Sequence, residues 1–273
     1  MRACQPPSWY RHPVSPVRFP PANKGKPPQT GSPAGLACVS WGIVGRTPNL
    51  PAARLLPEWR SPEPNDRFGL VALDFNLTPE RVISAYQHGI FPWPDGDQRF
   101  PIPWVCPPRR AVLEFDALHL PRSLRKSQRR LAQLRFTIDR AFEQVVRACA
   151  AAPRPGQRGT WITPPMVATY VQVHRRGHAH SIEAWDGDAL VAGMYGVTSG
   201  GVFAGESMFH RLDDASKLCL LHLVSHLQAR GATWIDIQQL TPHLAALGAR
   251  EISRREFLQR LAAEQRLSRT LFP

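Results

Sequence analysis

An α+β fold is the class that this sequence predicts, from three observations. In the first half of the chain, apolar residues recur at helical spacing between capping residues and glycines. In the second half, two apolar segments flank Asp186-Gly187, a dipeptide typical of a tight β-hairpin. A long apolar helix pattern then separates two further strand patterns, at residues 203–209 and 234–237. With 43% hydrophobic residues among 273, the chain can bury a substantial core.

Helix signals come first along the chain. Thr78 is suited to cap a helix that has Pro79 at its first position and ends at Gly89. The residues that follow the glycine, 90–93, are expected to be extended, and residues 111–115 read as an apolar strand. The order helix, extended segment, strand therefore precedes the main strand region.

A strongly basic helix is expected at residues 121–134. It contains five cations and no acid: Arg122, Arg125, Lys126, Arg129 and Arg130. Such a helix face has two readings, a solvated surface or a patch that follows the phosphates of a nucleic acid, and the residues by themselves leave both open.

Two more helices complete the first half. Asp139 is suited to cap the first of them. Its apolar face comprises Phe142, Val145, Val146 and Cys149. Thr163, followed by two prolines, opens the second, which is expected to end at Gly177.

Strands dominate the second half. Residues 180–185 and 189–197 form the hairpin, and residues 203–209 form a third strand after a glycine turn. A helix at residues 214–230 then leads to a fourth strand at 234–237. Three meandering strands, a helix and a returning strand match the core of the acetyltransferase-like (GNAT) fold, in which the last connection is a right-handed crossover.

The composition divides the chain into three parts. Residues 1–57 form a basic, Pro-rich tail that is expected to be disordered, because 14 of the 28 prolines lie in the first 64 residues and no acid precedes Glu58. Residues 58–117 are expected to form a small N-terminal α/β subdomain. Residues 118–273 are expected to form the acetyltransferase-like domain.

The net charge indicates which kinds of partner are plausible, and the cysteines indicate the redox compartment. A formal charge of +13 makes an anionic partner such as RNA or a phosphorylated cofactor plausible. The five cysteines are widely spaced and form no Cys-x-x-Cys pair, which favours reduced thiols in the cytoplasm. No apolar run reaches the roughly 18 residues that a membrane span requires.

Several catalytic motifs are missing from the sequence. Gly205-Glu206-Ser207 begins like a serine-hydrolase motif but lacks its second glycine. His174, His178 and His180 do not predict a metal site, because Gly177 is expected to end the helix between them. None of the 19 glycines forms a Gly-x-Gly pair, which argues against a nucleotide cofactor and against acetyl-CoA.

Three polar residues lie at unusual positions in apolar strands. Glu206 interrupts the strand at residues 203–209, and Asp236 interrupts the next strand, with Gln238 two residues further on the same predicted face. Each carboxylate alone reads as an ion-paired or edge residue, since a buried charge is costly without a partner. The three together favour a polar site in an apolar cavity.

Between about residues 68 and 261, the chain contains a series of short, distinctive sequence motifs. These blocks are residues 88–93, 159–163, 177–183, 193–197, 205–209, 215–217, 235–238 and 247–249, with His243 and Arg254-Arg255. Together they resemble leucyl/phenylalanyl-tRNA-protein transferases. The resemblance implies a C-terminal domain with the acetyltransferase-like fold. It also implies transfer of Leu, Phe or, less readily, Met from aminoacyl-tRNA to the N-terminal Arg or Lys of acceptor proteins, which marks them for degradation.

The same resemblance implies roles for particular residues. The pocket for the aminoacyl side chain would be lined by Met194, Phe203, Leu220, Leu223, Leu227 and Ile235. Trp161 would stack near the terminal adenosine of the tRNA, Trp93 would help to close the site, and the basic helix would follow tRNA phosphates. A monomer that needs no cofactor and no metal is expected.

The proposed chemistry needs positioning more than a strong base, because an aminoacyl ester is already activated and an α-amino group is partly neutral at pH 7. Gln238 is suited to accept a hydrogen bond from the attacking amine, Asp236 to orient that amine and Glu206 to attract the cationic N-terminal residue. These three residues are the catalytic candidates.

Two departures and two alternatives qualify the resemblance. Residues 67–77 and 103–109 differ from the usual family motifs, so the geometry of the N-terminal subdomain is open. An N-acetyltransferase that uses acetyl-CoA on the same fold is one alternative, and a non-enzymatic tRNA-binding protein is the other. Only the transferase is expected to move an aminoacyl group from tRNA to an Arg-starting peptide, and titration with acetyl-CoA tests the acetyltransferase alternative.

Overall fold

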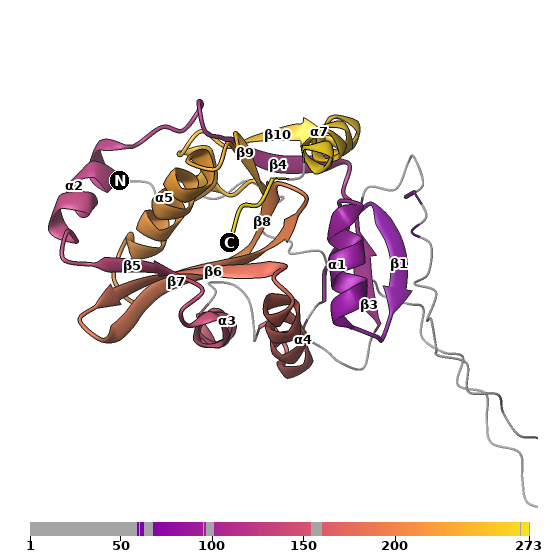
Figure 1. Cartoon of the computed structure of the whole chain (residues 1–273), viewed down its shortest axis with the longest axis horizontal. Helices are drawn as coiled ribbons and strands as arrows, with labels where there is room; N and C mark the ends of the chain where they lie inside the picture. Colours follow the sequence, from indigo (N-terminus) through magenta and orange to yellow (C-terminus); the bar gives the residue numbers. More distant parts are fainter. Residues whose placement is uncertain are drawn as a thin grey trace, which may run out of the picture. The chain divides into compact units, whose positions relative to one another are not determined.

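The computed structural model describes residue 59 and residues 61–62, 68–94, 96, 101–153, 160–267 and 269–272 (Figure 1). The tail predicted at residues 1–57 lies outside the described residues. The described part is a mixed α/β structure with two sheets.

The smaller sheet has three antiparallel strands in the order β1-β3-β2. These are β1 (Leu70–Asp74), β2 (Phe91–Pro92) and β3 (Ile102–Val105). Helix α1 (Pro79–Gln87) connects β1 to β2, and the Thr78 hydroxyl accepts a hydrogen bond from the backbone N–H of Arg81 at 3.3 Å. The sequence prediction for this helix, from its Thr cap to its Gly end, is confirmed.

The larger sheet has seven strands in the order β10-β4-β9-β8-β7-β6-β5. Their bounds are β4 (Arg109–Glu114), β5 (Arg135–Ile138), β6 (Ala179–Asp186), β7 (Ala189–Ser199), β8 (Val202–His210), β9 (Trp234–Gln238) and β10 (Arg250–Ser253). Neighbouring strands are antiparallel except β8 and β9, which run parallel. The three meandering strands, the helix and the returning strand that the sequence predicts are confirmed.

Helices cover both faces of the larger sheet. Helix α5 (Ala215–Gln228) lies on one face, while α3 (Phe142–Ala151) and α4 (Pro164–Arg175) lie on the other (Figure 1). Helix α2 (Arg122–Arg130) lies beside α5, and α7 (Arg254–Arg266) packs near β4 and β10. The remaining short helix is α6 (Pro242–Ala245).

Two hydrophobic cores result from this layering. Met194 and Phe203 belong to the core under α5, whereas Tyr195 and Ala204 belong to the core under α3 and α4. Because successive side chains of a strand point to opposite faces, each central strand contributes to both cores. This explains why β6 and β7 are buried almost throughout.

The predicted capping role of Asp139 is wrong. Helix α3 begins after Ala141 without a side-chain cap. Asp139 has a φ of 58°, and its carboxylate accepts a hydrogen bond from the backbone N–H of Ser181 at 2.8 Å and lies 2.7 Å from Nδ1 of His180. A long-range tie from the segment after β5 to strand β6 has replaced the local cap.

Other predicted boundaries also differ. The basic helix ends at Arg130 instead of Leu134, because Leu131 and Leu134 turn into the core under α5. Strand β4, which lies within the subdomain expected at residues 58–117, pairs with β9 and β10 in the larger sheet.

Two further observations concern the helices and the cysteines of the described residues. Among the described helices, none is long and apolar enough to cross a membrane. The described cysteines Cys106, Cys149 and Cys219 are buried and unbridged.

Candidate functional site

The candidate site lies where β8 and β9 run side by side. Parallel neighbours require a long crossover connection, and α5 supplies it. The crossover brings Ala204 of β8 beside Asp236 of β9. Glu206 and Gln238, which lie 32 positions apart in the sequence, therefore come within hydrogen-bonding distance.

Three donors from three different elements converge on the carboxylate of Glu206. Its Oε1 accepts hydrogen bonds from the Tyr86 hydroxyl and from Nε2 of Gln238, the latter at 2.5 Å. Its Oε2 accepts a hydrogen bond from the Tyr170 hydroxyl at 2.8 Å. Burial raises the pKa of Glu206 above its usual value, and the three hydrogen bonds act in the opposite direction.

The two tyrosines are functional candidates that sequence reasoning missed. Tyr86 comes from α1 and Tyr170 from α4, and their hydroxyl oxygens lie 3.4 Å apart. Burial, together with the negative charge of Glu206, raises the pKa of both phenols well above the usual value, so both remain protonated donors. The sequence feature that could have identified them is a tyrosine, with its polar hydroxyl, on the apolar face of each helix.

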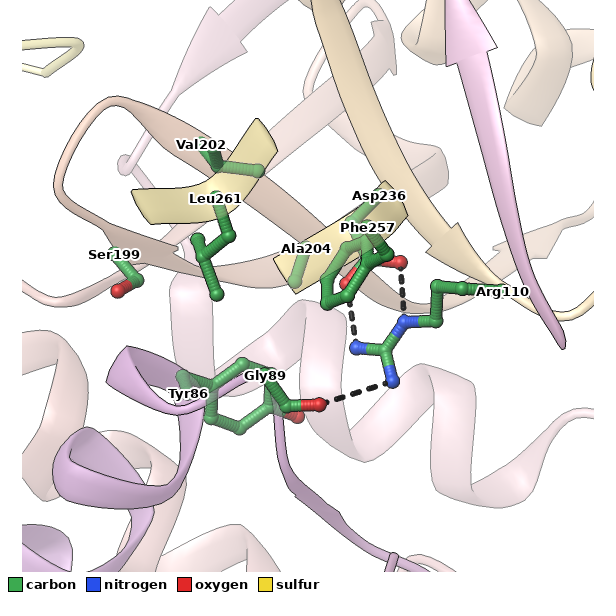
Figure 2. Close-up of a pocket in the computed structure, with 9 residues that line it drawn as sticks. All are labelled: Tyr86, Gly89, Arg110, Ser199, Val202, Ala204, Asp236, Phe257 and Leu261. Carbon is green, nitrogen blue, oxygen red and sulfur yellow. Dashed lines mark hydrogen bonds and ion pairs between the residues drawn. The ribbon is translucent and has the colours of Figure 1, made fainter. Parts of the chain in front are cut away.

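Asp236 is paired with a buried arginine. Its Oδ1 and Oδ2 accept hydrogen bonds from Nε and Nη2 of Arg110 at 2.8 and 2.6 Å, while Nη1 of Arg110 donates to the carbonyl oxygen of Gly89 at 3.3 Å (Figure 2). The two side chains are only 1% and 2% exposed. Burial lowers the pKa of Arg110, but the charge and hydrogen bonds of Asp236 raise it above its usual value.

Two aromatic rings enclose the guanidinium group of Arg110. Its central carbon lies 4.4 Å from the ring centroid of Phe91 and 4.6 Å from that of Phe257. Gly89 has a φ of 70°, and a Cβ there would lie 2.8 Å from the Phe257 ring. These contacts give a physical reason for the block at residues 88–93. Arg110, which follows the exposed Arg109 in β4, was not among the site residues predicted from the sequence.

Gln238 links the two carboxylates. Its backbone N–H donates to Oδ1 of Asp236 at 2.8 Å, and its side-chain amide nitrogen donates to Glu206. Its φ of 59° departs from strand geometry, so strand alternation does not set the direction of its side chain. Because the amide nitrogen faces Glu206, the amide oxygen is the end that remains as an acceptor.

Comparison with known proteins decides the family. A family model described as "Leucyl/phenylalanyl-tRNA protein transferase" matches residues 112–262, and the model for the N-terminal domain of that family matches residues 75–108. The chain belongs to this family. A relative from Anaeromyxobacter dehalogenans is 49% identical over 213 residues, which cover 78% of this chain and 89% of the relative.

A second relative has the same name, and a solved structure of another protein is similar at lower sequence identity. A leucyl/phenylalanyl-tRNA–protein transferase of Nitratidesulfovibrio vulgaris is 49% identical, with coverage of 70% of this chain and 80% of the relative. Among solved structures, "The structure of L-PGS from Bacillus licheniformis" has a TM-score of 0.37 at 12% identity, covering 60% of this chain and 53% of that one.

The six apolar residues that the sequence resemblance led us to expect in an aminoacyl pocket lie together. All six are in the core between α5 and the larger sheet and are 0–3% exposed: Met194, Phe203, Leu220, Leu223, Leu227 and Ile235. Gly196 makes room for this group, because a Cβ at Gly196 would lie 2.5 Å from the Phe203 ring. Phe203 and Ile235 of this group lie on the same strands as Glu206 and Asp236, β8 and β9.

The two tryptophans lie in neighbouring segments. Trp93 follows β2 and Trp161 precedes α4, and both are half-buried. Gly96, with a φ of 93°, packs so closely on the second segment that a Cβ would lie 2.5 Å from the carbonyl oxygen of Thr160 and 3.7 Å from Cα of Trp161. Both rings pack against the core under α3 and α4.

The basic helix is anchored at the start of α5. Ser127 donates a hydrogen bond to Asp214 at 2.7 Å, and Arg130 donates to the carbonyl oxygen of Asp213 at 3.3 Å. All five cations of α2 are exposed: Arg122, Arg125, Lys126, Arg129 and Arg130. Their charge is therefore available to solvent or to an anionic partner.

Asp139, His174 and His180 also meet, although the sequence did not predict a metal site from the histidines. One potential ligand atom from each lies within 4.8 Å of the others. Their ring nitrogens already have protein partners: Nδ1 of His174 lies 2.8 Å from the carbonyl oxygen of Ala179, and Nδ1 of His180 faces Asp139. These contacts explain the cluster as a structural tie between β6 and its neighbours.

Proposed function

We propose that this protein transfers Leu, Phe and, less readily, Met from aminoacyl-tRNA to the N-terminal Arg or Lys of acceptor proteins, which marks those proteins for degradation. One observation carries the proposal: the hydrogen-bonded pair of Glu206 and Gln238 is built on β8 and β9, the same strands that contribute Phe203 and Ile235 to the apolar core under α5. Membership of the transferase family supports the tRNA-linked donor.

Glu206 is suited to bind the cationic N-terminal residue of the acceptor. Tyr86, Tyr170 and Gln238 donate to its carboxylate and hold it in one orientation. A guanidinium or ammonium group would then form a charge-assisted hydrogen bond in a partly buried place, where charge attraction is weakly screened. Acceptors that begin with Asp or Glu are excluded by repulsion from the same group.

Gln238 is suited to receive the attacking amine. Its amide oxygen can accept a hydrogen bond from the neutral α-amino group and direct the nitrogen lone pair toward the ester carbonyl. Asp236 differs from the sequence-based expectation, because both of its oxygens are engaged by Arg110 and Gln238. We therefore assign Asp236 as a positioning residue that holds Gln238, instead of a group that contacts the amine.

The reaction needs no cofactor in this scheme. The acceptor nitrogen forms an amide bond to the aminoacyl carbon, the ester bond to the terminal ribose breaks, and the ribose oxygen leaves with the proton that the amine releases. The ester supplies the driving force, so the protein contributes alignment and solvent exclusion.

The tRNA is assigned to α2 and to the separate segments that carry the two tryptophans. The exposed cations of α2 suit contacts to phosphates, and the half-buried rings of Trp93 and Trp161 suit stacking on the terminal adenosine. We also propose an acetyltransferase-like (GNAT) core, because β6, β7, β8, α5 and β9 follow its order. A monomer working in the cytoplasm, where charged tRNA is made, is part of the same proposal.

The test is transfer of labelled Leu from Leu-tRNA to a peptide that begins with Arg. The expected product is the peptide extended by one Leu, with little product from a matched peptide that begins with Asp. Acetyl-CoA supplied without tRNA serves as the control for the acetyltransferase alternative. An acetylated peptide, or no Leu transfer by a well-folded preparation, would contradict the proposal.

A further inference from the structure

The last described residues fold back into the core that contains the proposed aminoacyl pocket. Leu271 and Phe272 are 4% and 9% exposed, and both belong to the hydrophobic cluster that holds the six pocket residues. They follow α7 and lie in neither a strand nor a helix. A terminal segment of the chain therefore completes an apolar core built by β7, β8, β9 and α5.

Phe272 is held in place by contacts on several sides. Its ring stacks on His180 of β6 with centroids 3.9 Å apart and planes 7° apart, and it lies 5.0 Å from the ring of His226 in α5. Nε2 of His226 also lies 2.9 Å from the carbonyl oxygen of Leu271. Asp139 in turn binds His180 at 2.7 Å, which fixes the surface on which Phe272 stacks.

The ring of Phe272 adjoins a wall of the proposed pocket. Its centroid is 5.9 Å from that of Phe203, whose own ring covers Gly196 on the sheet. The neighbour of His226 in the last turns of α5 is Leu227, a second residue assigned to the pocket. Phe272 thus packs against Phe203 and beside the last turns of α5, in the cluster that also contains Leu227.

We infer that Phe272 forms the end wall of the aminoacyl pocket and sets the largest side chain that the protein transfers. The inference rests on the proposed function. An aminoacyl side chain that reaches past Phe203 would meet the Phe272 ring, whose centroid lies 5.9 Å from that of Phe203. Replacing that ring with a smaller group leaves space that a larger aminoacyl side chain can fill.

The test compares two donors that differ only in ring size: tRNA carrying Phe and the same tRNA carrying 2-naphthylalanine, each with an Arg-starting peptide. The quantity measured is the ratio of kcat/KM for naphthylalanine to that for Phe. We expect Phe272→Leu to raise this ratio about 10-fold or more over wild type, in line with what one or two carbons are worth in an apolar pocket.

A matched control is Phe142→Leu. Phe142 is 3% exposed and stacks on His174, but it lies on the opposite face of the larger sheet. The control loses the same atoms from a core, so it reports the effect of lower stability alone and should leave the ratio unchanged. Should Phe272→Leu fail to fold, Phe272→Met keeps more of the volume and is scored by the same ratio.

The outcomes separate the two proposals. Wild-type protein that transfers no Phe contradicts the proposed function itself. Wild-type protein that transfers Phe, with the same ratio in the Phe272 variants, contradicts the end wall alone. An equal rise in Phe142→Leu also contradicts it, because the change would then reflect general loosening of the fold.

Discussion

Arg110 and Asp236 form a two-pronged ion pair although they lie 126 positions apart in the chain. The Nε–Oδ1 and Nη2–Oδ2 distances are 2.8 and 2.6 Å, and both side chains are almost fully buried. The pair joins β4 to β9 and, through the backbone N–H of Gln238, fixes the start of the segment after β9.

Removal of one partner of this pair should destabilise the fold strongly. Asp236→Leu leaves the Arg110 charge buried without its partner, and we expect the free energy of unfolding to fall by about 3–5 kcal/mol. Urea unfolding monitored by tryptophan fluorescence measures this loss. The control is Arg109→Ala, because Arg109 is 60% exposed, lies 3.5 Å from Glu251 and should contribute about 0–1 kcal/mol. Equal losses in the two variants would contradict the assignment.

Glu206 should make acceptor binding depend on pH. Its carboxylate form attracts the cationic N-terminal residue, and its pKa is raised by burial, so the KM for an Arg-starting peptide should increase as the pH falls through that raised pKa. Glu206→Gln removes the titrating group, so its KM should be at least about 10-fold higher near neutral pH and should no longer rise at acidic pH. Steady-state kinetics from pH 5 to pH 8 measure both effects. A parallel rise in KM in the wild type and the variant would assign the pH dependence to another group.

Gln238 should affect turnover more than binding of the donor. Gln238→Ala removes the proposed acceptor for the amine, and we expect kcat to fall about 10²–10³-fold with little change in the KM for Leu-tRNA. Single-turnover transfer with saturating Leu-tRNA isolates this step. Gln239→Ala is the matched control, because Gln239 is the same residue type one position further and is exposed. A wild-type rate in Gln238→Ala would remove Gln238 from the mechanism.

The basic helix should act through charge alone. Arg125→Ala combined with Arg129→Ala removes two exposed cations of α2, and each lost phosphate contact should weaken tRNA binding and reduce its salt dependence. We expect the slope of log affinity against log salt to fall by about 1–2, with the melting temperature unchanged. Binding of tRNA measured between 50 and 300 mM salt provides the slope. Arg147→Ala, at an exposed position of α3, should leave the slope unaltered.

The local sequence was sufficient to predict a helix or a turn wherever a few neighbouring residues determine the backbone conformation. Thr78, Pro79 and Gly89 define α1, and Asp186-Gly187 identifies the turn between β6 and β7. These signals act over one or two turns of chain, so they can be read without knowing the fold. The same is true of the ordered blocks that resemble the transferase family, which the comparisons confirm.

The partners of the site residues could not be read in the same way. The sequence singled out Glu206, Asp236 and Gln238 as polar residues in apolar strands, but it did not identify Tyr86, Tyr170 or Arg110 as their partners. It also misassigned Asp139, whose carboxylate ties to β6 instead of capping a helix. In each case, the decisive contact joins residues that are distant in the sequence.

By itself, then, the sequence determined the main helices and strands between α1 and β9, the family and the unusual carboxylates of this protein, but not β1, β3, β5, α6, β10 or α7. Only the tertiary structure decided that Asp236 is committed to Arg110, that Glu206 is held by two tyrosines, and that Phe272 closes the core under α5. The physical reason is that a buried charge or ring takes the partner that the packing of helices and strands brings to it. That packing depends on the whole chain, whereas a cap or a turn depends on a few residues.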